Sequence, residues 1–155
     1  MKIIPGDLDA PAVRTLISEH LQDMRANSPA CSIHALDLSE LRSPRLSFWT
    51  VWDDDGIHKR LAGCGALKEL DGEGEIKTMR TVRTMRGRGA ARFMLEHIVS
   101  EARARNFSRV SLETGSQDFF HPARSLYAAH GFTTCPPFGD YTEDPNSVFM
   151  TLPLR

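Results

Sequence analysis

Apolar residues recur along this chain with a period near 3.6 in some segments and near 2 in others. Helical spacing is clearest in residues 10–24, where the apolar positions fall on one face. These positions are Val13, Leu16, Ile17, Leu21 and Met24. The spacing returns in residues 89–105, where the expected buried positions are Phe93, Leu95, Ile98, Val99 and Ala102. Residues 122–130 complete the set of long helices, and residues 36–41 predict a short one.

Alternating segments predict the strands of one sheet. They cover residues 2–4, 45–52, 59–70, 75–81, 108–113, 132–135 and 147–152. Polar turns at residues 53–56 and 69–74 join three successive strands, which are therefore expected to be antiparallel. The acidic turn at residues 53–55 is interpreted as solvated rather than as a metal site. A helix separates strands 75–81 and 108–113, and this crossover makes that pair parallel. The prediction is an α/β fold with a mixed, mostly antiparallel twisted sheet of about six or seven strands and about four flanking helices.

Composition narrows the class of protein. The 155 residues suit a single domain covering residues 1–155, with 41% hydrophobic and 25% charged residues. No apolar run approaches the ~20 residues of a membrane span, and the net charge of −1 gives no basic field for nucleic acid or an anionic membrane. The three cysteines lack metal-site or C-x-x-C spacing, and the chain start has no signal-peptide pattern. We therefore expect a cytoplasmic protein without a metal.

Two glycines between the strand at 75–81 and the helix at 89–105 are the strongest chemical signal. Gly87 and Gly89 are separated by one residue. The arginines around them are Arg83, Arg86, Arg88 and Arg92. Small residues allow a ligand to approach the backbone, and the first N–H groups of a helix are free donors in a positive dipole field. The segment therefore predicts an anion-binding site for a small polyanionic molecule.

Spacing separates three kinds of phosphate site. A P-loop needs Gly-Lys-Ser or Gly-Lys-Thr, which is absent here. A dinucleotide-binding fingerprint needs a third glycine where this chain has Arg92, although Glu113 stands about two dozen residues further on, near the place of the ribose-binding acid. The third kind is the pattern [QR]-x-x-G-x-[GA], which residues 86–91 satisfy.

That third pattern resembles the acetyl-CoA pyrophosphate loop of the GNAT superfamily of N-acetyltransferases. A second motif of the superfamily, A-x-x-L-Y-x-x-x-G-F, is matched downstream in the right order. Its fixed positions here are Ala123, Leu126, Tyr127, Gly131 and Phe132. The resemblance covers nearly the whole chain and is best over residues 72–133.

The resemblance implies the GNAT fold, acetyl-CoA as acetyl donor, and a set of residues that bind it. The pyrophosphate would lie on the N–H groups of residues 88–91, and the pantetheine arm would bond to the backbone of residues 79–81. Arg124 is a further candidate for a phosphate, because Phe120 stands where the family often has a pantetheine-binding Asn. The donor-binding candidates are Met79, Arg80, Thr81, Arg86, Gly87, Arg88, Gly89, Ala90, Ala91 and Arg124.

Two catalytic roles follow from the same resemblance. Tyr127 matches the family tyrosine that protonates the leaving thiolate, and a phenol with a pKa near 10 carries its proton at neutral pH. Glu75 is the first candidate for the base that takes the amine proton, and Glu113 is the second. Direct loss of the proton to water is the remaining alternative.

The acceptor is less defined by sequence. In the superfamily the segment between the first helices forms one wall of the acceptor site, which makes His34 and Asp37 candidates for specificity, together with Phe138 and Tyr141. A small-molecule amine is favoured over a protein tail, and a homodimer stays open. The competing functions are a non-catalytic acyl-CoA-binding module on the same fold and a dinucleotide-binding domain.

Overall fold

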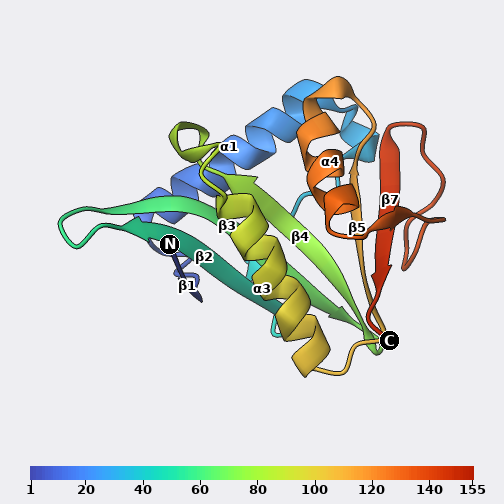
Figure 1. The fold of residues 1–155 in the computed structure, drawn as a ribbon. Helices are drawn as coiled ribbons and strands as arrows, with labels where there is room; N and C mark the ends of the chain where they lie inside the picture. The colour runs from blue at the N-terminus through green and yellow to red at the C-terminus, as the bar shows by residue number, and fades with distance from the viewer.

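A computed structural model describes residues 1–155, and its seven strands form one mixed sheet (Figure 1). The strand order is β1-β2-β3-β4-β5-β7-β6. The strands are β1 Lys2–Pro5, β2 Leu46–Asp54, β3 Lys59–Leu70, β4 Glu73–Thr81, β5 Arg109–Gly115, β6 Thr133–Thr134 and β7 Ser147–Pro153. The predicted parallel pair is confirmed as β4 and β5, and all other neighbours are antiparallel. This order differs from the all-parallel sheet of a dinucleotide-binding fold.

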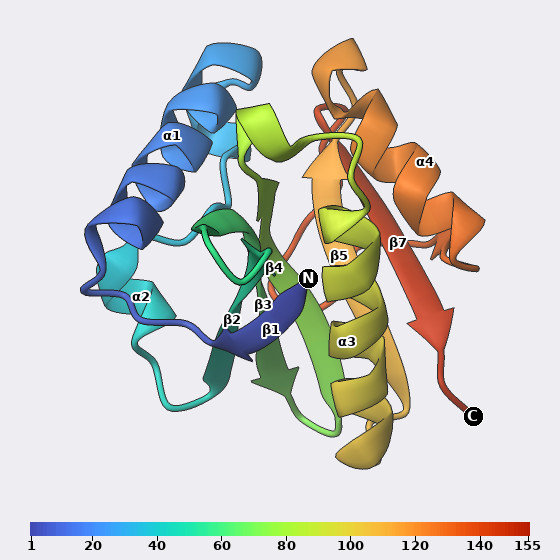
Figure 2. The same ribbon diagram turned by 60° about the vertical axis from the view of Figure 1, so that its left-hand side comes forward.

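Four α-helices cover the two faces of the sheet. They are α1 Pro11–Asn27, α2 Leu38–Leu41, α3 Ala90–Ala104 and α4 His121–Ala129. Figure 2 shows α1 and α2 on one side and α3 and α4 on the other. Each side has its own apolar core, of 9 buried residues around α1 and of 17 around α3. None of these helices has the length and apolarity to cross a bilayer.

The buried face of α3 differs from the expected one at one position. Met94 is 1% exposed in the core, whereas Phe93 is 39% exposed. The first helical residue is Ala90, which is buried, and the i+4 neighbour of a buried residue lies on the same face. Since residues 93–95 are all apolar, their pattern alone left two choices of face.

The turn between β3 and β4 is tighter than expected. Residues 69–74 were expected to form it, yet only Asp71 and Gly72 lie outside the two strands. Gly72 has φ +71°, a backbone conformation that glycine adopts without strain and that suits a two-residue hairpin. β4 consequently begins at Glu73, two residues before the expected start.

A β-bulge in β4 shapes the centre of the molecule. Cys64 pairs with Arg80 and Ala66 with Lys77, so two residues of β4 lie opposite Gly65 alone. One of them, Thr78, has φ +54°, which is rare for a β-branched residue. β4 pairs with β5 only up to Ile76, and beyond this point the two strands separate, as Figure 1 shows. The sheet is thereby opened between its only parallel strands.

Candidate active site

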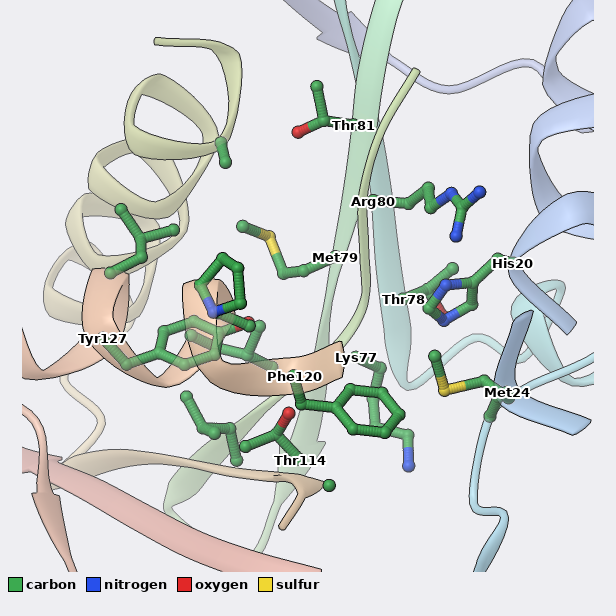
Figure 3. Close-up of a pocket in the computed structure, with 18 of the residues that line it drawn as sticks. His20, Met24, Lys77, Thr78, Met79, Arg80, Thr81, Thr114, Phe120 and Tyr127 are labelled. Atoms are coloured by element: carbon green, nitrogen blue, oxygen red, sulfur yellow. The ribbon is translucent and has the colours of Figure 1, made fainter. Parts of the chain in front are cut away.

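A cavity of about 580 Å³ lies where β4 and β5 separate. Its walls come from β4 and β5, from the start of α3, from α4 and the turn before it, and from the C-terminal half of α1 with the loop that follows (Figure 3). Most of the expected donor-binding residues line this one space. They are Met79, Arg80, Thr81, Arg86, Gly87, Gly89, Ala90 and Ala91.

The start of α3 forms an open cradle at one end of the cavity. Gly87 and Gly89 have φ +78° and +84°, and a Cβ at either would meet no atom within 4 Å. No side chain caps the helix, so its first N–H groups keep their capacity to bind an anion. Arg86 adds a positive charge on the wall, and these features fit the pyrophosphate of a coenzyme A molecule.

Two of the expected donor-binding side chains do not line the cavity. Arg88 turns toward β2, where its guanidinium lies 3.6 Å from the Asp53 carboxylate. Arg124 donates hydrogen bonds of 2.6 and 3.0 Å to the backbone oxygens of Gly115 and Gln117. The Arg124 guanidinium thus holds the chain at the end of β5 in place and does not line the cavity.

Phe120 closes the space beside that segment. A Cβ on Gly115 would lie 2.1 Å from the Phe120 ring, so only glycine allows the ring to pack against the end of β5. Phe120 lines the cavity, and its ring supplies an apolar wall (Figure 3). This is the position where the GNAT superfamily often has an asparagine that binds the pantetheine.

Tyr127 lies on α4 with its ring directed into the cavity (Figure 3). Its side chain packs in the α3-side core, and the residue is 6% exposed. Burial alone raises the pKa of the Tyr127 phenol above its usual value, because removal from water disfavours the phenolate. The hydroxyl is therefore held protonated at neutral pH beside the open space.

Glu75 is buried behind the cavity wall. It is 3% exposed and does not line the cavity. Its Oε2 atom accepts a 2.6 Å hydrogen bond from the Tyr141 hydroxyl and lies 3.4 Å from the Lys77 ammonium. Lys77 also donates to Tyr141 Oη and to the His34 backbone oxygen. The carboxylate is therefore bound within a polar network of the protein.

Glu113 is the carboxylate that lines the cavity, near the end of β5. Burial raises its pKa to about 7, although the positive charge of Lys77 opposes the change. A carboxyl with this pKa exchanges its proton close to neutral pH, which suits a general base or acid.

The far end of the cavity is formed by α1 and the segment after it. His34 lines it, and its ring stands edge-on to Tyr141 at 4.9 Å between centroids. The Phe138 ring also contacts Tyr141, at 5.2 Å between ring centroids, and Phe138 does not line the cavity. Asp37 does not line the cavity. Its carboxylate accepts a 2.8 Å hydrogen bond from Glu40 N and caps α2.

A second polar cluster lies at this end, and no sequence pattern predicted it. His20 of α1 faces Thr78 and Arg80 of β4 across the cavity wall, as Figure 3 shows. Arg80 was expected to contribute only its backbone. A histidine within an apolar helix face and an arginine within a strand become neighbours only when α1 packs on β4.

Comparisons with known proteins identify the family of this chain. The model of the acetyltransferase (GNAT) family matches residues 13–132. An uncharacterized N-acetyltransferase of Bacillus subtilis is 52% identical over 155 residues, which cover 99% of this chain and 100% of that protein. One of Escherichia coli is 46% identical over 149 residues, covering 96% of this chain and 91% of that protein.

Among solved structures, a proposed acyl-CoA N-acyltransferase from Klebsiella pneumoniae has a TM-score of 0.79 at 28% identity, covering 99% of this chain and 97% of that one. Transfer of an acetyl group from acetyl-CoA is the activity of the matched family. The family model spans most of the chain, and both sequence relatives are named N-acetyltransferases. The chain belongs to the GNAT family of acetyltransferases.

Proposed function

We propose that this chain transfers an acetyl group from acetyl-CoA to the amine of a small molecule, within the cavity between β4 and β5. The observation that carries the proposal is the continuity of that cavity. One space joins the open start of α3, the Tyr127 ring, the Glu113 carboxyl and the wall formed by α1. Donor and acceptor can therefore meet where a proton donor and a proton acceptor are both present.

The donor-binding role is assigned to the backbone on both sides of the bulge and to the start of α3. Residues 79–81 would bond the pantetheine arm, and the N–H groups of residues 88–91 the pyrophosphate, with Arg86 adding charge. The separation of β4 from β5 supports the first assignment, because it leaves the edge of β4 unpaired beyond Ile76. The open cradle at Gly87 and Gly89 supports the second.

Glu113 is assigned the role of base in place of Glu75. Its position on the cavity and its pKa of about 7 support the assignment, whereas Glu75 is bound to Tyr141 and Lys77. Acetyl-CoA, when bound, supplies the thioester carbonyl that the amine attacks and the thiolate that leaves. Glu113 accepts the proton that the amine loses, and Tyr127 donates its hydroxyl proton to the leaving sulfur. Solvent then returns the proton to Tyr127 and removes the one on Glu113.

A non-catalytic acyl-CoA-binding module is the alternative. The proposal is tested first by the melting temperature of the protein with acetyl-CoA and with NAD, where only acetyl-CoA should stabilise the fold. The release of free thiol from acetyl-CoA with a panel of amines follows. Stabilisation without thiol release for any amine would favour the binding module. The cytoplasmic location and the homodimer stay predictions from the sequence.

A further inference from the structure

Three buried side chains at the α1 end of the cavity have polar atoms without a partner in the protein. They are Nδ1 of His20, Oγ1 of Thr78, and Nε and Nη2 of Arg80. All three residues line the cavity and are less than a tenth exposed. Buried donors without acceptors are costly, and most buried polar groups in proteins are paired. A ligand that accepts hydrogen bonds would remove this cost.

The geometry of Arg80 indicates which chemical group such a ligand carries. Its Nη1 atom lies 2.6 Å from Oδ2 of Asp23, on α1. The contact uses one edge of the guanidinium and leaves the edge formed by Nε and Nη2. Two parallel N–H groups on one edge match the two oxygens of a carboxylate in a bidentate pair.

The charge around Arg80 also favours an anion. Asp23 is shared, because its Oδ1 atom lies 2.9 Å from Nη2 of Arg83, so one carboxylate faces two guanidinium groups. His20 adds no charge to this balance. Burial and then the positive charge of Arg80 lower the pKa of its imidazole to about 4, so the ring is neutral at pH 7. The Asp23 carboxylate is thus shared between buried Arg80 and exposed Arg83, and it does not fully compensate the charge of Arg80.

We propose that the amine acceptor also carries a carboxylate, which binds the Nε and Nη2 edge of Arg80 and accepts further hydrogen bonds from Thr78 Oγ1 and His20 Nδ1. The acceptor is then an amino acid or a related amino carboxylate. This inference rests on the proposed function only in calling the ligand the acetyl acceptor. Binding of a carboxylate at Arg80 can be measured without any acetyl transfer.

Binding of reaction products tests the site without turnover. The probes are N-acetyl amino acids, each compared with its primary amide, titrated by calorimetry into the protein saturated with CoA. At least one carboxylate should bind about 10- to 100-fold more tightly than its amide, the range expected for hydrogen bonds to a charged group. The absence of such a preference in every pair would overturn the proposal, and this comparison needs no variant.

Two matched variants assign the preference to Arg80. Arg80→Met keeps an unbranched apolar stem and removes the guanidinium group, so the ratio between carboxylate and amide affinity should fall to about 1. Arg83→Met removes the same charge from the same aspartate. Arg83 does not line the cavity and its side chain is 61% exposed, so the ratio should persist. A preference that survives in Arg80→Met would overturn the proposal. If that variant does not fold, Thr78→Val should still lower the ratio, and an unchanged ratio there would count against the site.

The outcome is separable from that of the proposed function. If amines without a carboxylate are acetylated as fast as amino acids, the proposed acetyltransferase function stands and the proposed carboxylate site is wrong. If a carboxylate binds in an Arg80-dependent way but no amine is acetylated, the carboxylate site stands and the proposed reaction is wrong.

Discussion

The hydroxyl of Tyr141 donates a 2.6 Å hydrogen bond to Glu75, 66 residues earlier in the chain. Lys77 contacts both groups, at 2.9 Å from the hydroxyl and 3.4 Å from the carboxylate. The bond ties the loop before β7 to β4 and occupies a carboxylate that the sequence favoured as the base. Glu113 is left as the carboxylate on the cavity. The difference between these two acids leads to the first two predictions.

Glu113→Gln should remove the titration of the base from the rate profile. In the wild type kcat/KM should rise with pH and level off above about 7, because Glu113 accepts a proton only when ionised and its pKa is about 7. In the variant we expect a loss of about 10²-fold in kcat/KM at pH 8 and no inflection near 7. The check is kcat/KM from pH 5.5 to 9, with Glu75→Gln as control. An inflection that persists in Glu113→Gln would assign the proton to water or another group.

The same substitution should stabilise the fold at alkaline pH. The pKa of Glu113 is raised from 4.5 to about 7, so the folded state holds its proton more tightly. The resulting stability is present below pH 4.5 and is lost as pH rises through 7. Glutamine avoids the burial of a charge, and Glu113→Gln should melt at a higher temperature than the wild type at pH 8. Glu75→Gln should melt lower, because it breaks the ion pair with Lys77. Equal melting temperatures for the two variants would refute this assignment.

Gly89→Glu should abolish binding of CoA while the protein stays folded. A carboxylate there would stand in the cradle that binds the pyrophosphate and would repel it. Gly56→Glu is the matched control. Gly56 has φ +85°, close to the +84° of Gly89, is equally open, and lies in the turn between β2 and β3 away from the cavity. Both variants carry similar backbone strain, so a loss of affinity in titration calorimetry that is confined to Gly89→Glu would isolate the effect at the cradle. Unchanged CoA affinity in that variant would disprove the cradle.

Tyr127→Phe should lower kcat by roughly 10²-fold with little effect on the affinity for acetyl-CoA, since the proton is needed only when the thiolate leaves. The ring and its packing are kept, so the melting temperature should change little. A tyrosine that only fills the core would instead show normal kcat per folded molecule. Normal turnover in the variant would point to protonation of the thiolate by solvent.

The order of elements was predictable because its signals are local. Alternation and helical spacing lie within single segments, and the crossover between residues 75–81 and 108–113 follows from chain connectivity. The family followed from two motifs whose residues are close in sequence. The face of α3 was partly wrong, because three consecutive apolar residues at 93–95 fit two orientations.

Features that depend on distant contacts were not predictable. The bulge at Thr78 is set by the register of β4 against β3, and no glycine stands next to Thr78 in the sequence to mark it. Glu75 does not line the cavity, and its carboxylate accepts a hydrogen bond from Tyr141, 66 residues further along the chain. The pairing of Arg80 with Asp23 requires α1 to pack on β4. Each of these arises from tertiary packing, which a pattern within one segment does not encode.

The decisive measurement is acetyl transfer itself. Purified protein is incubated with acetyl-CoA and a panel of amines that includes amino acids, and both free thiol and acetylated amine are quantified, the latter by mass spectrometry. We predict one acetylated amine for each thiol released with at least one acceptor, and a rate about 10²-fold lower in Tyr127→Phe. Binding of acetyl-CoA with no acetylated amine from any acceptor would contradict the account and identify the chain as a binding module.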